Sequence, residues 1–207
     1  MKHLDKAIIC TLAILFAIPG SLAQTDGMLG AKAGINISTL TLNNAIDRTG
    51  LSAGLFYRSD PVKQLGYQAE LLYSTRGADW HVGFLGVSQD VSVRLDYLDL
   101  PVMLVYRPLP VLELHGGAYA GYLLSAGYSA TGILINETGQ VGRGNFKQVD
   151  LGALLGLAMN IGPVQLGGRY NFGLTRVSDS FVTNLVLGDA HHRFAQLYAA
   201  YIIPVRR

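Results

Sequence analysis

The chain has 207 residues, a length that suits one domain, and carries 16 Lys and Arg against 14 Asp and Glu. A formal net charge of only +2 with few basic clusters argues against nucleic acid as a partner. Half of the residues are hydrophobic, yet past the N-terminal segment no stretch approaches the roughly 18 continuous apolar residues that a membrane-spanning helix needs.

The N-terminus has the three parts of an export signal. They are a positive start (Lys2, His3 and Lys6), an apolar core (Ala7–Ile18) and a small-residue cleavage site (Ser21-Leu22-Ala23). We therefore predict that residues 1–23 are a removed signal peptide and that residues 24–207 form the mature domain, with an uncleaved anchor as the alternative. Because the only cysteine, Cys10, lies in this segment, disulfide and thiol chemistry are excluded from the mature chain.

Eight apolar-patterned stretches follow, and the connections between them alternate in length. The long connections are Thr39–Thr49, Gly77–Val91, Gly127–Asn145 and Val177–His192. The short ones are Ser59–Gln64, Arg107–Pro110 and Asn160–Pro163. Strands that cross a bilayer back and forth produce this rhythm, with tight periplasmic turns and longer outer loops. The sequence predicts an all-β fold: an eight-stranded antiparallel up-and-down transmembrane β-barrel.

Within the stretches, apolar and polar residues alternate with a period of two. In Gly30–Ser38 the alanines and isoleucines share one face, opposite Lys32 and Asn36, and Gly66–Arg76 repeats the pattern. A Lys or Arg side chain at the bilayer midplane costs about 2–4 kcal/mol, so the charged face is expected to point inward. The predicted luminal polar network is Lys32, Glu70, Asp99, Glu113, His115, Asp150 and Arg169.

Two expectations follow for the lumen and its rim. Eight strands enclose a space that side chains just fill, so we expect a packed polar plug and no open channel. Arg94 and Asp96 have the parity of the lipid-facing side, and we expect them above the membrane, near the long connection.

Four tyrosines with outward parity fall near the short connections. They are Tyr57, Tyr67, Tyr106 and Tyr201. Tyrosine is enriched where a membrane meets water, so these residues predict a periplasmic aromatic girdle. Ordinary cross-strand packing in a soluble barrel is the alternative.

Several strings of this sequence resemble a known family. The most specific are ELLYS at Glu70–Ser74, YLDLP at Tyr97–Pro101 and RYNFGL at Arg169–Leu174. They resemble the PorT-like outer-membrane β-barrel domain of Bacteroidetes, in order, across nearly all of the mature chain. The resemblance implies an eight-stranded barrel in the outer membrane of a Gram-negative bacterium, and it implies no reaction. One departure is the C-terminus, YIIPVRR, where such barrels usually end in an aromatic residue.

The last long connection contains the sharpest candidates for chemistry. They are Ser178, Asp179, Ser180, Asp189, His191 and His192. A Ser-His-acid set at the cell surface would make a lipid-modifying hydrolase, but no nucleophile-elbow string is present and a solvated loop has the same composition. Trp80 and His81 are a candidate contact surface for a partner or for lipopolysaccharide.

These observations favour a non-enzymatic outer-membrane barrel that acts as a surface scaffold or interaction protein, with function in its outer loops. We expect no cofactor and no metal. The expected partners are outer-membrane lipid and lipopolysaccharide, together with a protein bound through the outer loops, and no nucleic acid. The alternatives are the lipid-modifying hydrolase and a soluble lipocalin-like barrel that holds a ligand.

Overall fold

The structure, a computed structural model, describes residues 27–40, 46–59, 64–84, 87–132, 137–140, 148–176 and 191–205. The predicted signal peptide, residues 1–23, lies outside these ranges. No helix in the described part of the chain is long and apolar enough to cross a membrane.

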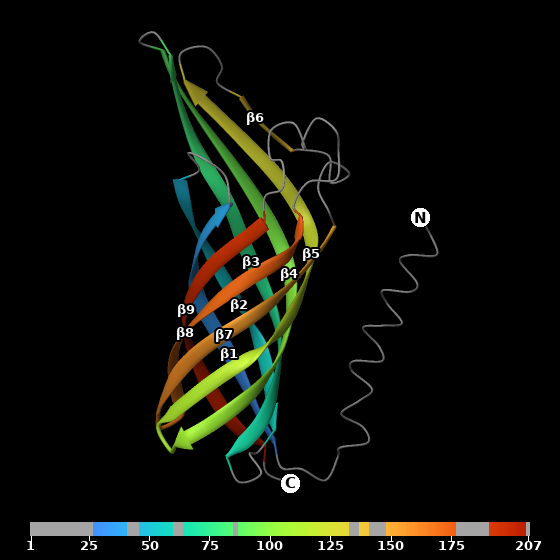
Figure 1. The fold of residues 1–207 in the computed structure, drawn as a ribbon, viewed down its shortest axis with the longest axis vertical. Helices are drawn as coiled ribbons and strands as arrows, with labels where there is room; N and C mark the ends of the chain where they lie inside the picture. The colour runs from blue at the N-terminus through green and yellow to red at the C-terminus, as the bar shows by residue number, and fades with distance from the viewer. Residues whose placement is uncertain are drawn as a thin grey trace, which may run out of the picture.

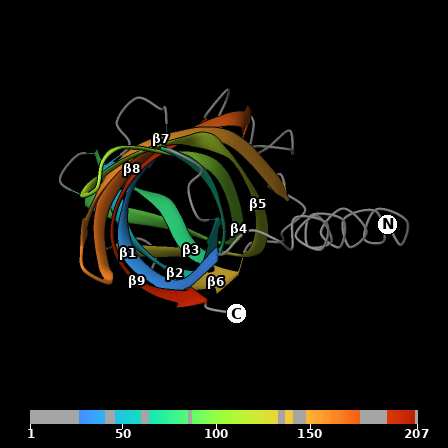
Figure 2. The same cartoon turned by 90° about the horizontal axis from the view of Figure 1, so that it is seen from below.

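The described residues form nine antiparallel strands, of which eight close into a barrel (Figures 1 and 2). The strands are β1 (Gly27–Leu40), β2 (Ile46–Ser59), β3 (Leu65–Phe84), β4 (Val87–Leu109), β5 (Leu112–Gly132), β6 (Glu137–Gln140), β7 (Val149–Ile161), β8 (Val164–Arg176) and β9 (His191–Val205). Each long strand pairs with its neighbours in the chain, β1 pairs with β9, and the short β6 lies on the upper part of β5. The predicted eight-stranded up-and-down barrel is confirmed.

The short connections lie at one end of the barrel, which we call the turn end, and the opposite end is the loop end. Between β7 and β8 the turn has two residues, because Ile161 and Val164 are paired. Gly162 has a φ of 61°, a left-handed conformation that favours glycine, and the fixed φ of Pro163 suits the second turn position. This geometry returns the chain at once into the next strand.

Two of the predicted long connections contain more strand than the sequence pattern indicated. Most of Gly77–Val91 is a β-hairpin, since β3 continues to Phe84 and β4 starts at Val87. Inside Gly127–Asn145, β6 adds a short strand to β5. The hairpin continues the β3–β4 register without a shift, and the β4–β5 pairing extends beside it as far as Gln89 and Gly132.

The outer face of the barrel is an apolar band. Outward residues such as Leu51, Leu55 and Leu155 are more than 60% exposed, while most residues of the opposite parity in each strand are buried. On β5 the outward apolar run from Leu114 to Leu124 covers ten steps of about 3.3 Å, which at a tilt near 40° gives a band roughly 25 Å tall. That height matches the hydrocarbon layer that transmembrane barrels span.

Candidate functional site

All seven residues predicted for the lumen are buried inside the barrel, and none is more than 5% exposed. They are Lys32, Glu70, Asp99, Glu113, His115, Asp150 and Arg169. The structure brings them together in two groups of ion pairs, one toward the turn end and one toward the loop end. Each group contains an arginine that the sequence pattern did not assign to the lumen.

Glu113 on β5 is the centre of the group near the turn end. Its carboxylate is fully buried and accepts hydrogen bonds from side chains on β2, β7 and β8 and from the end of β4. Its donors are Arg58 (2.8 Å), Arg107 (2.8 and 3.1 Å), Asn160 (2.8 Å) and Gln165 (2.7 Å), and Nε2 of His115 lies 3.1 Å away. A carboxylate has about four lone-pair sites, so the acceptor capacity of Glu113 is saturated.

Glu70 on β3 is a second shared carboxylate, above Glu113. It pairs with Lys32 on β1 and accepts a hydrogen bond of 2.8 Å from Arg169 on β8. The ammonium group of Lys32 also lies 3.8 Å from the centre of the Tyr198 ring, a cation–π distance. Through Gln68, which donates to Glu70 (2.6 Å) and accepts from Arg58 (2.7 Å), this pair is linked to the Glu113 group.

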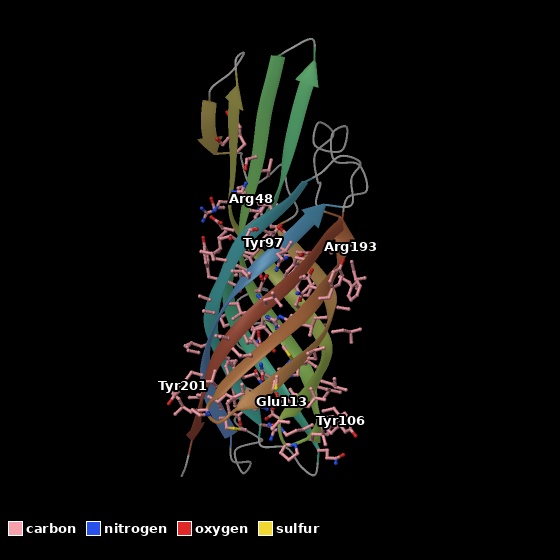
Figure 3. All side chains as sticks on the ribbon, turned by 90° about the vertical axis from the view of Figure 1, so that its left-hand side faces the viewer. Arg48, Tyr97, Tyr106, Glu113, Arg193 and Tyr201 are labelled. Atoms are coloured by element: carbon pink, nitrogen blue, oxygen red, sulfur yellow. The ribbon has the colours of Figure 1, made fainter. Side chains whose placement is uncertain are left out.

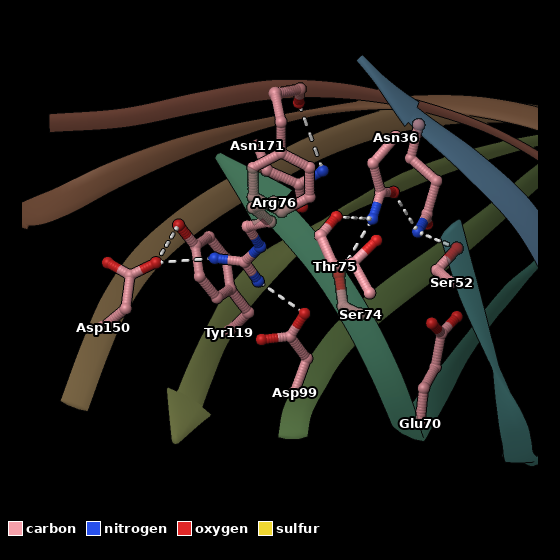
Figure 4. Close-up of polar contacts among 12 residues, drawn as sticks. Asn36, Ser52, Glu70, Ser74, Thr75, Arg76, Asp99, Tyr119, Asp150 and Asn171 are labelled. Carbon is pink, nitrogen blue, oxygen red and sulfur yellow. Dashed lines mark hydrogen bonds and ion pairs between the residues drawn. The ribbon is translucent and has the colours of Figure 1, made fainter. Parts of the chain in front are cut away.

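Arg76 on β3 is the centre of the group toward the loop end (Figure 4). Its guanidinium pairs with Asp99 and, at 2.8 Å, with Asp150. The rings of Phe194 and Tyr97 lie 4.1 and 4.7 Å from it. Asp150 also accepts hydrogen bonds from Tyr119 (3.1 Å) and Thr175 (2.6 Å), so one buried cation is held by two anions and by aromatic faces.

An uncharged layer separates the two groups. Asn36 donates to Ser74 (2.9 Å), and Gln196 donates to Asn36 (2.9 Å) and to Ser52 (2.7 Å) (Figure 4). All four side chains are buried. Hydrogen bonds between neutral groups link the four side chains of this layer without adding charge to the lumen.

The buried charges balance in sign. The fully buried cations Lys32, Arg58, Arg76 and Arg169 face the anions Glu70, Asp99, Glu113 and Asp150. Each of the eight takes part in an ion pair with another of them, which is what a low-dielectric interior requires. The ion pairs therefore connect strands that are not neighbours in the sheet, such as β2 with β5 and β3 with β8, and the charges of these eight side chains cancel.

The lumen is less polar than the predicted polar plug. Two apolar clusters fill the spaces around the ion pairs: Phe56, Ala158, Tyr198, Ala200 and Ile202, and Met103, Val105, Tyr119, Leu154 and Phe194. Aromatic rings pack against glycines of neighbouring strands, where no side chain occupies the space. A Cβ on Gly167 would lie 2.5 Å from the Tyr198 ring, and a Cβ on Gly152 would lie 2.3 Å from the Tyr119 ring. A small barrel has to be filled to protein density, and charged side chains alone do not do this.

Arg58 and Arg76 are the buried charged residues of the lumen that sequence reasoning missed. Both side chains are buried, yet both stand at the end of a patterned stretch, beside a predicted connection where a charged residue is expected to be solvated. Arg76 is an even number of residues from Glu70, so the alternation of faces along a strand could have assigned it to the lumen. This assignment requires the strand to continue beyond Arg76, and β3 does so.

The four predicted girdle tyrosines lie at the turn end. Figure 3 shows Tyr106 and Tyr201 there, while Tyr57 lies near the end of β2 and Tyr67 near the start of β3, on either side of the connection between these strands. The rings of Tyr57 and Tyr67 are 6.2 Å apart, and those of Tyr106 and Tyr201 are exposed on the outer face. The Tyr106 hydroxyl donates to Gln64 in the adjacent turn at 3.3 Å. Toward the loop end, the exposed Arg94 donates to Asp96 at 2.9 Å and also contacts the hydroxyl of Tyr73 at 3.5 Å.

The hydrolase candidates fall mostly outside the described residues. Ser178, Asp179, Ser180 and Asp189 lie in residues 177–190, which the structure does not describe. His191 and His192 begin β9, but their side chains are not described either. Among the described residues, no group of three or more His, Cys, Asp or Glu side chains could hold a metal ion.

A projecting sheet, formed by the loop-end parts of β3, β4 and β5 with β6, extends beyond the barrel (Figure 1). These three barrel strands have 20, 23 and 21 residues, whereas the other five have 13 to 15. A tilted strand crosses a bilayer with about 9–11 residues, so the long strands have roughly ten residues to spare. Trp80 and His81 lie in the β3 part of this sheet.

The sequence matches a known protein family, and the fold is similar to solved structures of outer-membrane proteins. Residues 22–179 match the family model of the outer membrane protein beta-barrel domain. The structure is similar to that of Ail, the attachment invasion locus protein of Yersinia pestis (16% identity, 86% of this chain and 99% of that chain, TM-score 0.48). It is also similar to Neisserial surface protein A (13%, 86% and 97%, 0.44) and to OprG of Pseudomonas aeruginosa (11%, 87% and 98%, 0.41). No curated protein matches the sequence.

Proposed function

Since this chain belongs to the outer membrane protein beta-barrel domain family and its barrel lies in the outer membrane, we propose that it is a non-enzymatic surface protein that binds a protein partner through the projecting sheet. The observation that carries the proposal is the extra length of β3, β4 and β5 beyond what a bilayer requires. In this view the lumen stabilises the barrel, and recognition takes place outside the cell.

The experiment removes the β3–β4 hairpin of the projecting sheet and keeps the barrel. Residues 79–92 are replaced by an Asn-Gly turn that joins the paired residues Ala78 and Val93. In a matched control, residues 177–190 are replaced by a Gly/Ser linker. Proteins cross-linked at the surface of intact cells are then quantified for the three chains.

We expect the cross-linked partners to be lost with the hairpin and kept in the control, while both variants insert and show heat-modifiable migration in gels. Equal cross-linking by all three chains would refute the proposal. Loss of partners only in the control would move the site to the last loop.

The lipid contacts in this proposal are those of the apolar band and its borders. The band would contact the acyl chains of outer-membrane lipid, with the girdle tyrosines at the periplasmic surface. Arg94, which is 54% exposed beside Tyr73 and Asp96, would face the phosphates of lipopolysaccharide at the outer surface. The sequence strings that resemble the PorT-like domain support placing the chain in that branch of the family, in Bacteroidetes.

The lipid-modifying hydrolase is a separate hypothesis with its own test. His191→Ala and His192→Ala together would abolish any phospholipid or lipid A modification that depends on the last loop. A modification activity that is present in the intact chain and absent from this variant would overturn the non-enzymatic proposal. The soluble lipocalin-like alternative is not retained, because the apolar exterior and the family place the barrel in a membrane.

A further inference from the structure

Among the described residues, one stretch of the projecting sheet has a strand on one side only. The pairing of β3 with β2 ends at Asp79, opposite Ile46, where β2 begins. The pairing of β3 with β4 continues to Phe84, opposite Val87. Within the described residues, Trp80–Phe84 therefore forms a free edge five residues long (Figure 1).

The register tells which backbone groups this free edge presents. The N–H of Arg107 donates to the carbonyl of Gln64 at 2.8 Å, and the β3–β4 register then runs without a shift to Phe84. In an antiparallel pair, successive residues turn their N–H and C=O alternately toward and away from the partner. The backbone groups of even-numbered β3 residues therefore bond to β4. The odd-numbered Tyr67 is consistent with this assignment, because its N–H donates to the side chain of Ser59 on β2.

His81 and Gly83 are the odd-numbered residues of the free edge. Their backbone N–H and C=O groups point away from β4, toward the side where β2 has ended. This is the template that an added strand requires: alternating donors and acceptors at the spacing of an extended chain.

The sequence of the edge lacks the usual protection. The residues are WHVGF, with no Lys, Arg, Asp, Glu or Pro. Natural edge strands commonly carry a charge or a proline that prevents pairing with another chain. Here Trp, Val and Phe, which favour strands, occupy the edge instead. An unprotected strand-forming edge outside the membrane is expected where pairing is the function.

We propose that the Trp80–Phe84 edge binds an extended segment of another protein, which adds to the projecting sheet as an antiparallel strand next to β3. This rests on the proposed function and names its mode of recognition. Backbone donors and acceptors in alternation match a polypeptide better than a sugar or a lipid headgroup. A second copy fits less well: all copies cross the membrane in the same direction, so two β3 edges would meet in parallel, the weaker pairing.

The test uses a peptide of defined sequence and the full-length barrel in lipid nanodiscs. The peptide copies Val87–Arg94 of β4 (VSQDVSVR), because this segment already pairs antiparallel with β3 along its other side. A matched peptide has the same sequence with alternate amides methylated, which blocks one hydrogen-bonding edge. Peptide affinity and the hydrogen exchange of the His81 and Gly83 amides are measured.

Two barrel variants separate the backbone from the side chains. His81→Pro with Gly83→Pro removes both edge donors but no bond to β4, and proline is tolerated on an edge strand. His81→Thr with Gly83→Thr alters the same side chains and keeps both N–H groups. One lost hydrogen bond corresponds to roughly fivefold in affinity, so we expect the proline variant to bind roughly 25-fold more weakly and the threonine variant less than threefold more weakly.

Support requires slower exchange at His81 and Gly83 on binding of the unmodified peptide, together with loss of affinity in the proline variant or for the methylated peptide. The proposal is overturned if the proline and threonine variants bind equally, if methylation has no effect, or if cross-linking through residues 80–84 yields only homodimers. If the strand-pairing proposal is overturned in this way but removal of the hairpin still abolishes cross-linking of the cell-surface partners, the proposed function is retained. If both experiments fail, the β3–β4 hairpin of the projecting sheet is not the site.

Discussion

Glu113 offers a quantitative test of how the lumen stabilises the barrel. The substitution Glu113→Gln keeps the size of the side chain and one acceptor oxygen but removes the negative charge. Arg58, whose side chain is 1% exposed, then loses its ion-pair partner and retains its hydrogen bond to Gln68. Removal of one partner of a buried pair costs about 3–5 kcal/mol, whereas the partly exposed Arg107 adds no more than about 1 kcal/mol.

We therefore expect Glu113→Gln to lower the free energy of unfolding by about 3–5 kcal/mol and Arg107→Gln by no more than about 1 kcal/mol. The assay is urea unfolding of the barrel in lipid vesicles, followed by far-UV circular dichroism, because the single tryptophan lies in the projecting hairpin.

A double-mutant cycle identifies the cause. Arg58→Met combined with Glu113→Gln removes both charges, so its loss is expected to be at least about 2 kcal/mol smaller than the sum of the two single losses. The reasoning is refuted if Glu113→Gln unfolds within about 0.5 kcal/mol of the parent, or if the two losses simply add.

Two further predictions concern the outer face and the packing of the lumen. Leu155→Arg, at the middle of the apolar band, is expected to lower the free energy of unfolding by about 2–4 kcal/mol in the same urea assay. Leu174→Arg, at the outer border of the band, is expected to lower it by no more than about 1 kcal/mol. Equal losses would contradict the assigned position of the membrane. Gly167→Ala brings a Cβ within 2.5 Å of the Tyr198 ring and is expected to lower the free energy of unfolding by about 1–3 kcal/mol. At the outward Gly168 the nearest contact of a Cβ is 3.3 Å away, so Gly168→Ala is expected to stay within about 1 kcal/mol of the parent. Thermal unfolding of the two variants checks the difference.

Strand number, strand direction and the two faces of the barrel could be predicted from the sequence because each follows from local rules. The parity of Lys32 and Glu70 decides which face of a strand is charged, and the cost of a charge in lipid decides where that face points. Each short connection contains Pro, a residue that favours turns, and this local preference locates the turns.

The partners within the lumen could not be predicted, since they depend on the register and tilt of the closed barrel. Glu70 meets Lys32 and Arg169, which are 38 and 99 residues away in the chain. Arg76 was not assigned to the lumen because the patterned stretch ends with it, and the continuation of β3 depends on pairing with β4. The projecting sheet was expected to be loop for the same reason.

The apolar residues on the outside of the barrel face lipid, while the charged residues are buried inside. Spin labels placed one at a time along β8, from Val164 to Leu174, test this arrangement most directly by their collisions with oxygen, which concentrates in the lipid, in a reconstituted bilayer. We predict high oxygen accessibility at the even-numbered positions and low accessibility at the odd-numbered ones. A profile without the two-residue period, or with high accessibility at Gln165 and Arg169, would contradict this account.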